Sequence, residues 1–292
     1  MTTQDFYRQP AAMTSPGSYQ RLLADVPRGV GAIASVGHGL VIHEHITEAY
    51  GVTLTTERRA TVHVRPVAGL LERIAAEDGS PLTTAREPAR RLAGNCRHFT
   101  LLAVAALQAQ GTPARARCGF GGYFGSGAFE DHWVCEYWNE AARRWILADA
   151  QIDDVQLKLF DVDFDLMDVP RDRFLVAGDA WRLCRDGDAD PARFGLSFLN
   201  EGGYWWIAGN LLRDVAALNR MEMLPWDAWG AMPAPEEAVD GERLALFDRL
   251  AELTRDPDAA FADLTAAYRA DDRLRVPATV YNAVLNRPEP VP

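Results

Sequence analysis

The longest apolar stretch of the chain is residues 99–107, which contain only one polar residue. A helix that is apolar on nearly every side belongs in the interior of a domain. Asn95 precedes this stretch as a good helix N-cap, and Gly111 and Pro113 after it form a helix stop signal. The pattern therefore predicts a buried helix whose first turn begins at Cys96.

Downstream of this helix the apolar period changes to two. In residues 114–120, apolar side chains alternate with Arg115 and Arg117, which predicts a half-buried strand. Residues 132–138 and 145–149 show the same alternation and are separated by a short polar turn. We expect them to form two antiparallel strands of one hairpin.

The flanking segments carry weaker signals. Residues 67–76 have the spacing of an amphipathic helix, whereas the first twenty residues, with two prolines, look like a loose arm. The glycine-rich residues 119–131 predict a mobile loop. Beyond Asp154 the chain is expected to be mainly helical, with helices at residues 173–185, 204–220, 236–253 and 259–270.

These elements predict an α+β fold in three parts. We expect an N-terminal helical arm at residues 1–65 and a core at residues 66–153, in which the cysteine-bearing helix packs on a small antiparallel sheet. A helical C-terminal extension at residues 154–292 follows, and it can be integral to the same domain.

Composition restricts the classes of function. The chain has 292 residues, of which 48% are hydrophobic and 24% charged, as in an ordinary globular protein. A net charge of −11 argues against binding to nucleic acid or to an anionic membrane surface, because both need concentrated Lys and Arg. The start lacks the pattern of a signal peptide, no apolar run could span a bilayer, and the four cysteines are scattered. We expect a cytoplasmic protein with reduced thiols.

The position of Cys96 favours a reactive thiolate. The first turn of a helix offers unsatisfied N–H groups and the positive end of the helix dipole, which stabilise a thiolate. The other cysteines lie within apolar stretches and are expected to be core residues; they are Cys118, Cys135 and Cys184.

The predicted hairpin supplies partners for a nucleophile. If Trp138 pairs with Trp145, then Asp149 lies opposite Val134. His132, two residues from Val134 on the same face, is then a diagonal neighbour of Asp149, at a Cα separation of roughly 7–8 Å. A carboxylate at that distance can orient an imidazole, which can in turn take a proton from a thiol.

Cys96, His132 and Asp149 thus follow one another as nucleophile, base and orienting group. With their surroundings they resemble the transglutaminase-like superfamily, from about residue 67 to residue 153. The motifs that carry the resemblance are Gly94-Asn95-Cys96, Gly111-Thr112-Pro113-Ala114-Arg115, His132 with Glu136, and Trp145-Ile146-Leu147-Ala148-Asp149. The resemblance implies a papain-like α+β core in which these three residues form the catalytic triad. Members of the superfamily catalyse acyl transfer, including protein crosslinking, amide or peptide hydrolysis, deglycosylation of asparagine and amide synthesis.

The chain departs from the family pattern at two places. Val134 stands where an aromatic residue usually follows the histidine by two, and Trp133 stands one position earlier. His98 stands two residues after the cysteine, where an acidic or small residue is common. These departures leave the substrate class open. We expect Asn95 and Trp133 to contribute to the oxyanion or substrate site, and the backbone N–H of Cys96 to be one oxyanion donor.

Two other polar groups have simpler interpretations. Glu136 is expected to be a structural, ion-paired carboxylate rather than a catalytic one. His43 and His45 are two residues apart, which does not place them on one face of a helix, and no Cys or Asp is near them in sequence. We therefore expect no metal site there.

The sequence predicts cysteine-dependent acyl transfer, or hydrolysis of an amide or thioester, through a thioacyl-enzyme and without a metal or cofactor. The substrate would be an amide, a peptide or an acyl thioester, free or attached to a protein. Two alternatives remain: a non-catalytic transglutaminase-like module for binding or assembly, and an amide-forming biosynthetic acyltransferase.

Overall fold

The apolar stretch of residues 99–107 lies in α5, which spans Cys96–Ala109 and has Asn95 as its N-cap. Every residue of this helix except Ala109 is buried. Gly111 follows with a φ of 79°, a left-handed conformation that costs glycine little. The prediction of a buried helix beginning at Cys96 is confirmed.

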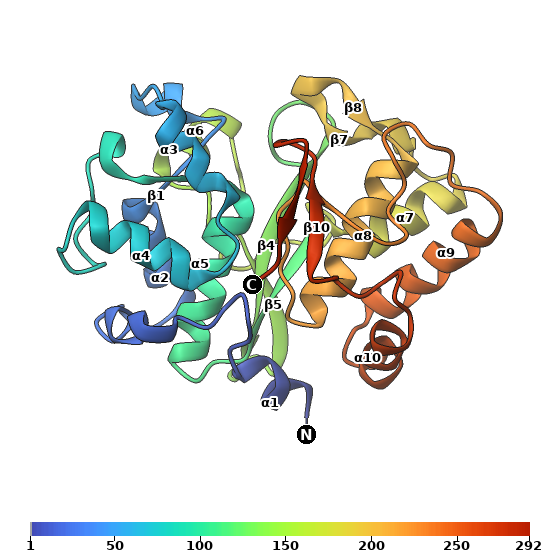
Figure 1. The fold of residues 1–292 in the computed structure, drawn as a ribbon, viewed down its shortest axis with the longest axis horizontal. Coiled ribbons are helices and arrows are strands. Elements are labelled where there is room, and N and C mark those ends of the chain that lie inside the picture. The colour runs from blue at the N-terminus through green and yellow to red at the C-terminus, as the bar shows by residue number, and fades with distance from the viewer. Residues whose placement is uncertain (1) are drawn as a thin grey trace. The chain divides into compact units, whose positions relative to one another are not determined.

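A computed structural model describes residues 2–292, which form two compact units (Figure 1). The first unit comprises residues 2–116 and 134–169, and the second comprises residues 117–133 and 170–292. Two strands, β3 (Ala114–Gly121) and β4 (Phe129–Asn139), contribute residues to both units. The three-part division expected from the sequence, with boundaries at residues 65 and 153, stays a prediction.

Helices dominate the first unit. Besides α5 it contains α1 (Thr3–Arg8), α2 (Val30–Leu40), α3 (Thr56–Arg59), α4 (Val67–Glu77) and α6 (Asp154–Phe160). The helix α2 packs along α5, and α4 also contacts α5. Two short parallel strands, β1 (Val41–His43) and β2 (Leu92–Gly94), place His43 opposite Gly94 immediately before α5.

The predicted hairpin is also present in this unit. The strand β4 pairs with β5 (Arg144–Ala148) in antiparallel register, with Trp138 opposite Trp145 and Cys135 opposite Ala148. The register assumed from the sequence is confirmed over this segment. Asp149 is the residue that directly follows β5.

The N-terminal segment corrects one expectation. Residues 1–20 were expected to form a loose arm, but Tyr7 on α1 and Met13 after it have no exposed surface. The Tyr7 ring packs edge-on against Trp145 and beneath the guanidinium of Arg115. Burial of these large side chains fixes the segment to the first unit.

The second unit is built around three helices that pack on one another: α7 (Ala177–Asp186), α8 (Tyr204–Leu218) and α9 (Gly241–Arg255). A further helix, α10 (Phe261–Ala270), contacts α9. The prediction that the segment after Asp154 is mainly helical holds in broad terms, but it missed several short strands. They are β6 (Phe174–Val176), β7 (Phe194–Leu196), β8 (Glu201–Gly202), β9 (Asp227–Ala228), β10 (Thr279–Asn282) and β11 (Arg287–Pro290).

Sheet pairing within the second unit brings distant segments together. Part of β3 pairs with β6, so that Phe120 lies opposite Leu175, and the start of β4 pairs with β7. The chain between β3 and β4, residues 122–128, is shorter than the loop expected at residues 119–131. Its Gly125 and Gly127 have φ values of 75° and 73°, which favour glycine.

The strand β3 corrects a second expectation. It was expected to be half-buried, but every residue from Ala114 to Gly121 is buried. In the second unit, Arg117 donates to both carboxylate oxygens of Asp214 at 3.0 and 2.8 Å, and to the carbonyl of Thr254 at 2.7 Å. Asp214 lies on α8 and Thr254 on α9. These charge-assisted bonds compensate the desolvation of Arg117.

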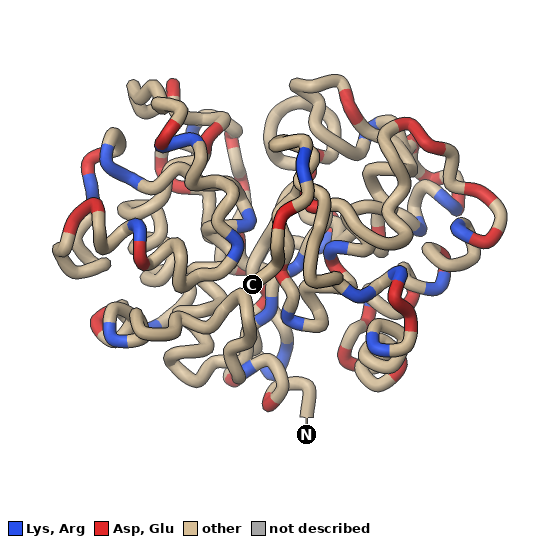
Figure 2. Tube along the Cα trace, viewed as in Figure 1, with Lys and Arg blue, Asp and Glu red and all other residues tan. Residues whose placement is uncertain are grey.

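The combination of helices and strands confirms the α+β class in its general sense, as a mixed helix-and-sheet protein. The papain-like arrangement of the core stays a prediction. Lys and Arg residues are spread along the trace and interleaved with Asp and Glu (Figure 2). Among residues 2–292, no helix has both the length and the apolar character needed to cross a membrane.

Candidate active site

Cys96 is the first residue of α5 and is 6% exposed. The imidazole of His98, two residues further on in the same turn, faces back toward the N-cap. Its Nδ1 lies 3.2 Å from the backbone nitrogen of Asn95 and 2.8 Å from the Asn95 carboxamide oxygen. His98 therefore closes the first turn around Cys96 in the manner of a capping box. The amide nitrogen of the Asn95 side chain is buried and has no hydrogen-bond partner within the described chain.

His98 is completely buried, and this sets its charge. Burial, followed by the positive charge of Arg97, holds the pKa of His98 well below its ordinary value of 6.5. The imidazole is therefore neutral near pH 7. The departure from the family pattern at this position places an uncharged ring, rather than a carboxylate, beside the N-terminus of α5.

Gly94 has a local reason to be glycine. A Cβ atom at this position would lie 2.9 Å from Cγ1 of Val41 and 3.0 Å from Cβ of His98. Both distances are shorter than normal carbon–carbon contacts. The close approach of β1 to β2 and the inward position of His98 therefore leave no room for a side chain directly before Asn95-Cys96.

Asp149 lies in the first unit together with Cys96 and is completely buried. Its backbone N–H donates to the carbonyl of Leu166 at 2.8 Å, and its Oδ1 accepts from the backbone N–H of Gln151 at 2.9 Å. The carbonyl of the next residue, Ala150, accepts from Nε2 of His38 at 3.0 Å. The carboxylate is thus held in a defined orientation within this unit.

His132 belongs to the part of β4 that lies in the second unit, and it is 2% exposed. Three aromatic rings surround its imidazole at steep angles. Phe124 lies 4.9 Å from it, Tyr123 6.0 Å and Phe174 6.2 Å, measured between ring centroids. Tyr123 and Phe124 come from the loop before β4 and give the histidine apolar cover. Phe174 comes from β6, and no sequence signal pointed to it.

Trp133, the other residue expected at the site, is fully buried in the second unit. On the other side of His132 in sequence, Asp131 accepts a 2.8 Å hydrogen bond from the indole N–H of Trp206 on α8. Burial raises the pKa of Asp131, while Arg213 partly opposes that shift. His132 therefore lies between two residues that are anchored in the second unit.

Glu136 behaves as the sequence analysis expected. It forms a 2.7 Å ion pair with Arg115, and both side chains are buried. The same guanidinium lies 4.0 Å from the ring centroid of Trp145. The expectation that Glu136 is ion-paired is confirmed, and the expectation that it is not catalytic stays a prediction.

The remaining cysteines are core residues, as expected. Cys118, Cys135 and Cys184 are buried free thiols. Burial raises the pKa of Cys135, which has no exposed surface, and raises the pKa of Cys184 to about 12. The described residues contain no group of three or more His, Cys, Asp or Glu side chains arranged to hold a metal ion.

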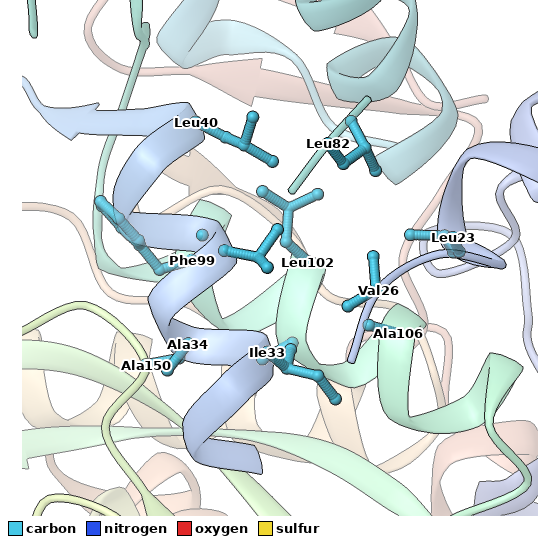
Figure 3. A pocket seen from close by; sticks show the side chains of 13 residues that line it. Leu23, Val26, Ile33, Ala34, Leu40, Leu82, Phe99, Leu102, Ala106 and Ala150 are labelled. Atoms are coloured by element: carbon cyan, nitrogen blue, oxygen red, sulfur yellow. The ribbon is translucent and has the colours of Figure 1, made fainter. Parts of the chain in front are cut away.

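An apolar hollow lies between α2 and α5 in the first unit (Figure 3). Ile33 and Leu40 line it from α2, while Phe99 and Leu102 line it from α5. None of its lining side chains carries a titratable or hydrogen-bonding group. This hollow therefore supplies packing space and not the groups that acyl chemistry requires.

Comparison with protein families gives a match to part of the chain. Residues 53–150 match the core of the transglutaminase-like superfamily. This transglutaminase-like segment contains Cys96, His132 and Asp149, and the recognition made from the sequence motifs is confirmed. It supports a cysteine-based catalytic role in general terms.

Other comparisons add little. The chain resembles a solved structure of a protein from Cytophaga hutchinsonii, provisionally described as a cysteine protease, with 15% identity and a TM-score of 0.30. The matched region covers 59% of this chain and 45% of that protein, so the chain spans less than half of its length. A likeness this weak supports no conclusion about fold or activity. No curated protein matches the chain.

The structure places the predicted site residues in two groups. Cys96, Asn95 and Asp149 lie in the first unit, whereas His132 and Trp133 lie in the second. The assembly of Cys96, His132 and Asp149 into one triad stays a prediction from the sequence.

Proposed function

We propose that the chain is a cysteine acyltransferase or hydrolase in which Cys96 forms a thioacyl intermediate with an amide, peptide or acyl-thioester substrate. The observation that carries this proposal is the position of Cys96 as the first residue of the buried helix α5, in a transglutaminase-like segment. Unsatisfied N–H groups at that position favour the thiolate and can also stabilise an oxyanion.

In this mechanism His132 accepts the proton of Cys96 while Sγ attacks the substrate carbonyl, and it later protonates the leaving group. Asp149 orients the imidazole and stabilises its protonated form. Support comes from the β4–β5 register, which ends with Cys135 opposite Ala148. Asp149 directly follows Ala148, and His132 is three residues before Cys135 on the same strand.

The proposed oxyanion site uses two donors. One is the backbone N–H of Cys96, and the other is the side-chain amide of Asn95. In support, the Asn95 carboxamide oxygen faces His98, and its amide nitrogen makes no hydrogen bond within residues 2–292. Buried donors without partners are uncommon, and a ligand oxygen would satisfy this one. Trp133 is proposed to border the acyl group of the substrate.

The acyl-enzyme would be resolved by water or by an amine, and the two outcomes define hydrolase and amide-forming acyltransferase. Intact-mass spectrometry of the protein mixed with a panel of acyl thioesters and amides tests the proposal. We expect an acyl adduct on Cys96 that is absent from Cys96→Ala and that disappears faster when hydroxylamine is added. Absence of any adduct, with Cys96 also unreactive toward a small thiol reagent, would favour the non-catalytic module.

A further inference from the structure

The helix α6 buries a polar residue and exposes apolar ones. Gln156 is its one buried side chain and is 1% exposed, whereas Val155, Leu157 and Leu159 are 38%, 37% and 56% exposed. A surface helix normally has the opposite arrangement, with an apolar stripe toward the core. Val155, Leu157 and Leu159 therefore add little apolar packing to the attachment of α6. The hydrogen bonds of Gln156 and of its N-cap, Asp153, contribute to that attachment.

Those hydrogen bonds form a continuous chain that leads to Asp149. The backbone N–H of Gln151 donates to Oδ1 of Asp149 at 2.9 Å, and Nε2 of Gln151 donates to Oε1 of Gln156 at 2.8 Å. Nε2 of Gln156 donates to the hydroxyl of Tyr50 at 2.9 Å. The Tyr50 hydroxyl in turn donates to Oδ1 of Asp153 at 2.8 Å. Every residue of the chain belongs to the first unit.

The direction of each bond is fixed by the chemistry of the groups. Gln156 uses its carbonyl oxygen toward Gln151 and its amide nitrogen toward Tyr50, so the carboxamide cannot turn over without losing both bonds. The Tyr50 hydroxyl accepts from Gln156 and donates to Asp153. Asp153 also accepts from the backbone N–H groups of Val155 and Gln156, both at 3.0 Å. Oε1 of Gln151 is the one side-chain atom of this chain that is buried without a partner among residues 2–292.

We propose that Gln156 is a positioning residue for Asp149. It acts through Gln151, whose backbone N–H fixes one carboxylate oxygen of Asp149, and Tyr50 holds Gln156 in the orientation that this requires. The inference rests on the proposed function, in which Asp149 orients His132. It adds that the orientation of the carboxylate is set by a glutamine on the helix that follows it and by a tyrosine about a hundred residues earlier.

The pH dependence of Cys96 alkylation by iodoacetamide tests this without knowledge of the substrate. The experiment uses the full chain, with Asp149→Asn as reference, Gln156→Leu and Tyr50→Phe as test variants, and Leu159→Ala as a control on the exposed face of the same helix. We expect Asp149→Asn to move the half-maximal rate to higher pH, because an imidazolium without its carboxylate stabilises a thiolate less. Gln156→Leu should move the half-maximal rate in the same direction and slow alkylation at pH 7 by on the order of tenfold. Losses of this size occur when hydrogen bonds that support the ligands of a metal site are removed.

Tyr50→Phe removes only a hydroxyl and is expected to give a smaller shift in the same direction. It provides the test if Gln156→Leu does not fold, which thermal unfolding of each variant would reveal. A shift in Asp149→Asn with wild-type profiles in folded Gln156→Leu and Tyr50→Phe would overturn this inference and leave the proposed function standing. A wild-type profile in Asp149→Asn would instead overturn the role of Asp149 on which both depend. A shift in Leu159→Ala equal to that of Gln156→Leu would show that loosening α6, and not the hydrogen-bond chain, moves the profile, and would also overturn the inference.

Discussion

Trp138 lies directly opposite Trp145 in the antiparallel pair β4–β5, with ring centroids 5.8 Å apart and ring planes inclined by 70°. This near edge-to-face contact is a favourable geometry for aromatic pairs. It helps to fix the register of the hairpin, and therefore the face of the sheet on which Asp149 follows β5. A slip of one residue would reverse that face.

Cys96 is expected to be the one cysteine of the folded protein that reacts quickly with iodoacetamide near neutral pH. It lies at the start of α5, whereas burial raises the pKa of Cys135 and, to about 12, that of Cys184. Cys118 has no exposed surface. Peptide mapping after brief labelling checks this, and labelling in denaturant should reach all four cysteines. Faster labelling of any of the other three in the folded protein would contradict the proposed role of Cys96.

Gly94→Ala is expected to lower the free energy of unfolding by about 1–3 kcal/mol, as overpacked sites do. The added Cβ would approach Val41 and His98 at 2.9 and 3.0 Å, so β1 or the start of α5 must move. Alkylation of Cys96 should slow as well, because its helix N-terminus is displaced. Urea unfolding and alkylation rates measure the two effects. Gly79→Ala is the control, since a Cβ there meets nothing within 4 Å. Equal behaviour of the two variants would argue against the crowding.

Asp214→Asn is expected to destabilise the chain strongly. It leaves Arg117 buried without its carboxylate, and breaking a buried pair costs about 3–5 kcal/mol. Replacing both Arg117 and Asp214 by leucine should cost much less than the sum of the costs of Arg117→Leu and Asp214→Leu. Urea unfolding of the two single variants and the double variant provides the cycle. Additive costs would mean that the pair contributes no coupling.

His98 is expected to make stability fall in acid. Its folded pKa lies well below the ordinary value of 6.5, so the unfolded state binds a proton that the folded state does not. The free energy of unfolding therefore declines as pH falls below about 6.5, by at most ~1.4 kcal/mol per pH unit for this one proton. His98→Gln retains a capping-box side chain without that titration. Urea unfolding between pH 7.5 and pH 5 should show a shallower decline in this variant, and an unchanged decline would exclude His98 as a source.

The elements predicted successfully are those whose signals are local. The cap, the apolar body and the glycine stop of α5 stand within twenty residues, and the β4–β5 hairpin is defined by two short alternating runs and their turn. The resemblance to the transglutaminase-like superfamily depended on the same segments, and the family match covers them.

The features that the sequence did not reveal depend on distant partners. Arg117 looked exposed because its carboxylate, Asp214, lies 97 residues away. The ring of Phe174 lies near His132, but it comes from a segment predicted as helix. Gln156 lies on α6, a helix that is not among those predicted from the sequence. In each case tertiary contacts, and not local preference, decide which side chains are buried.

The buried guanidinium of Arg117 also has a consequence for biosynthesis. The backbone carbonyl that completes its hydrogen bonding, that of Thr254, is separated from it by 137 residues. At typical synthesis rates a ribosome needs roughly 7–27 s to make that length of chain. Throughout this interval β3 carries a charge that cannot yet be buried. The segment at residues 53–150 is therefore synthesised before α8 and α9, and its Arg117 cannot complete its hydrogen bonds until α9 has been made.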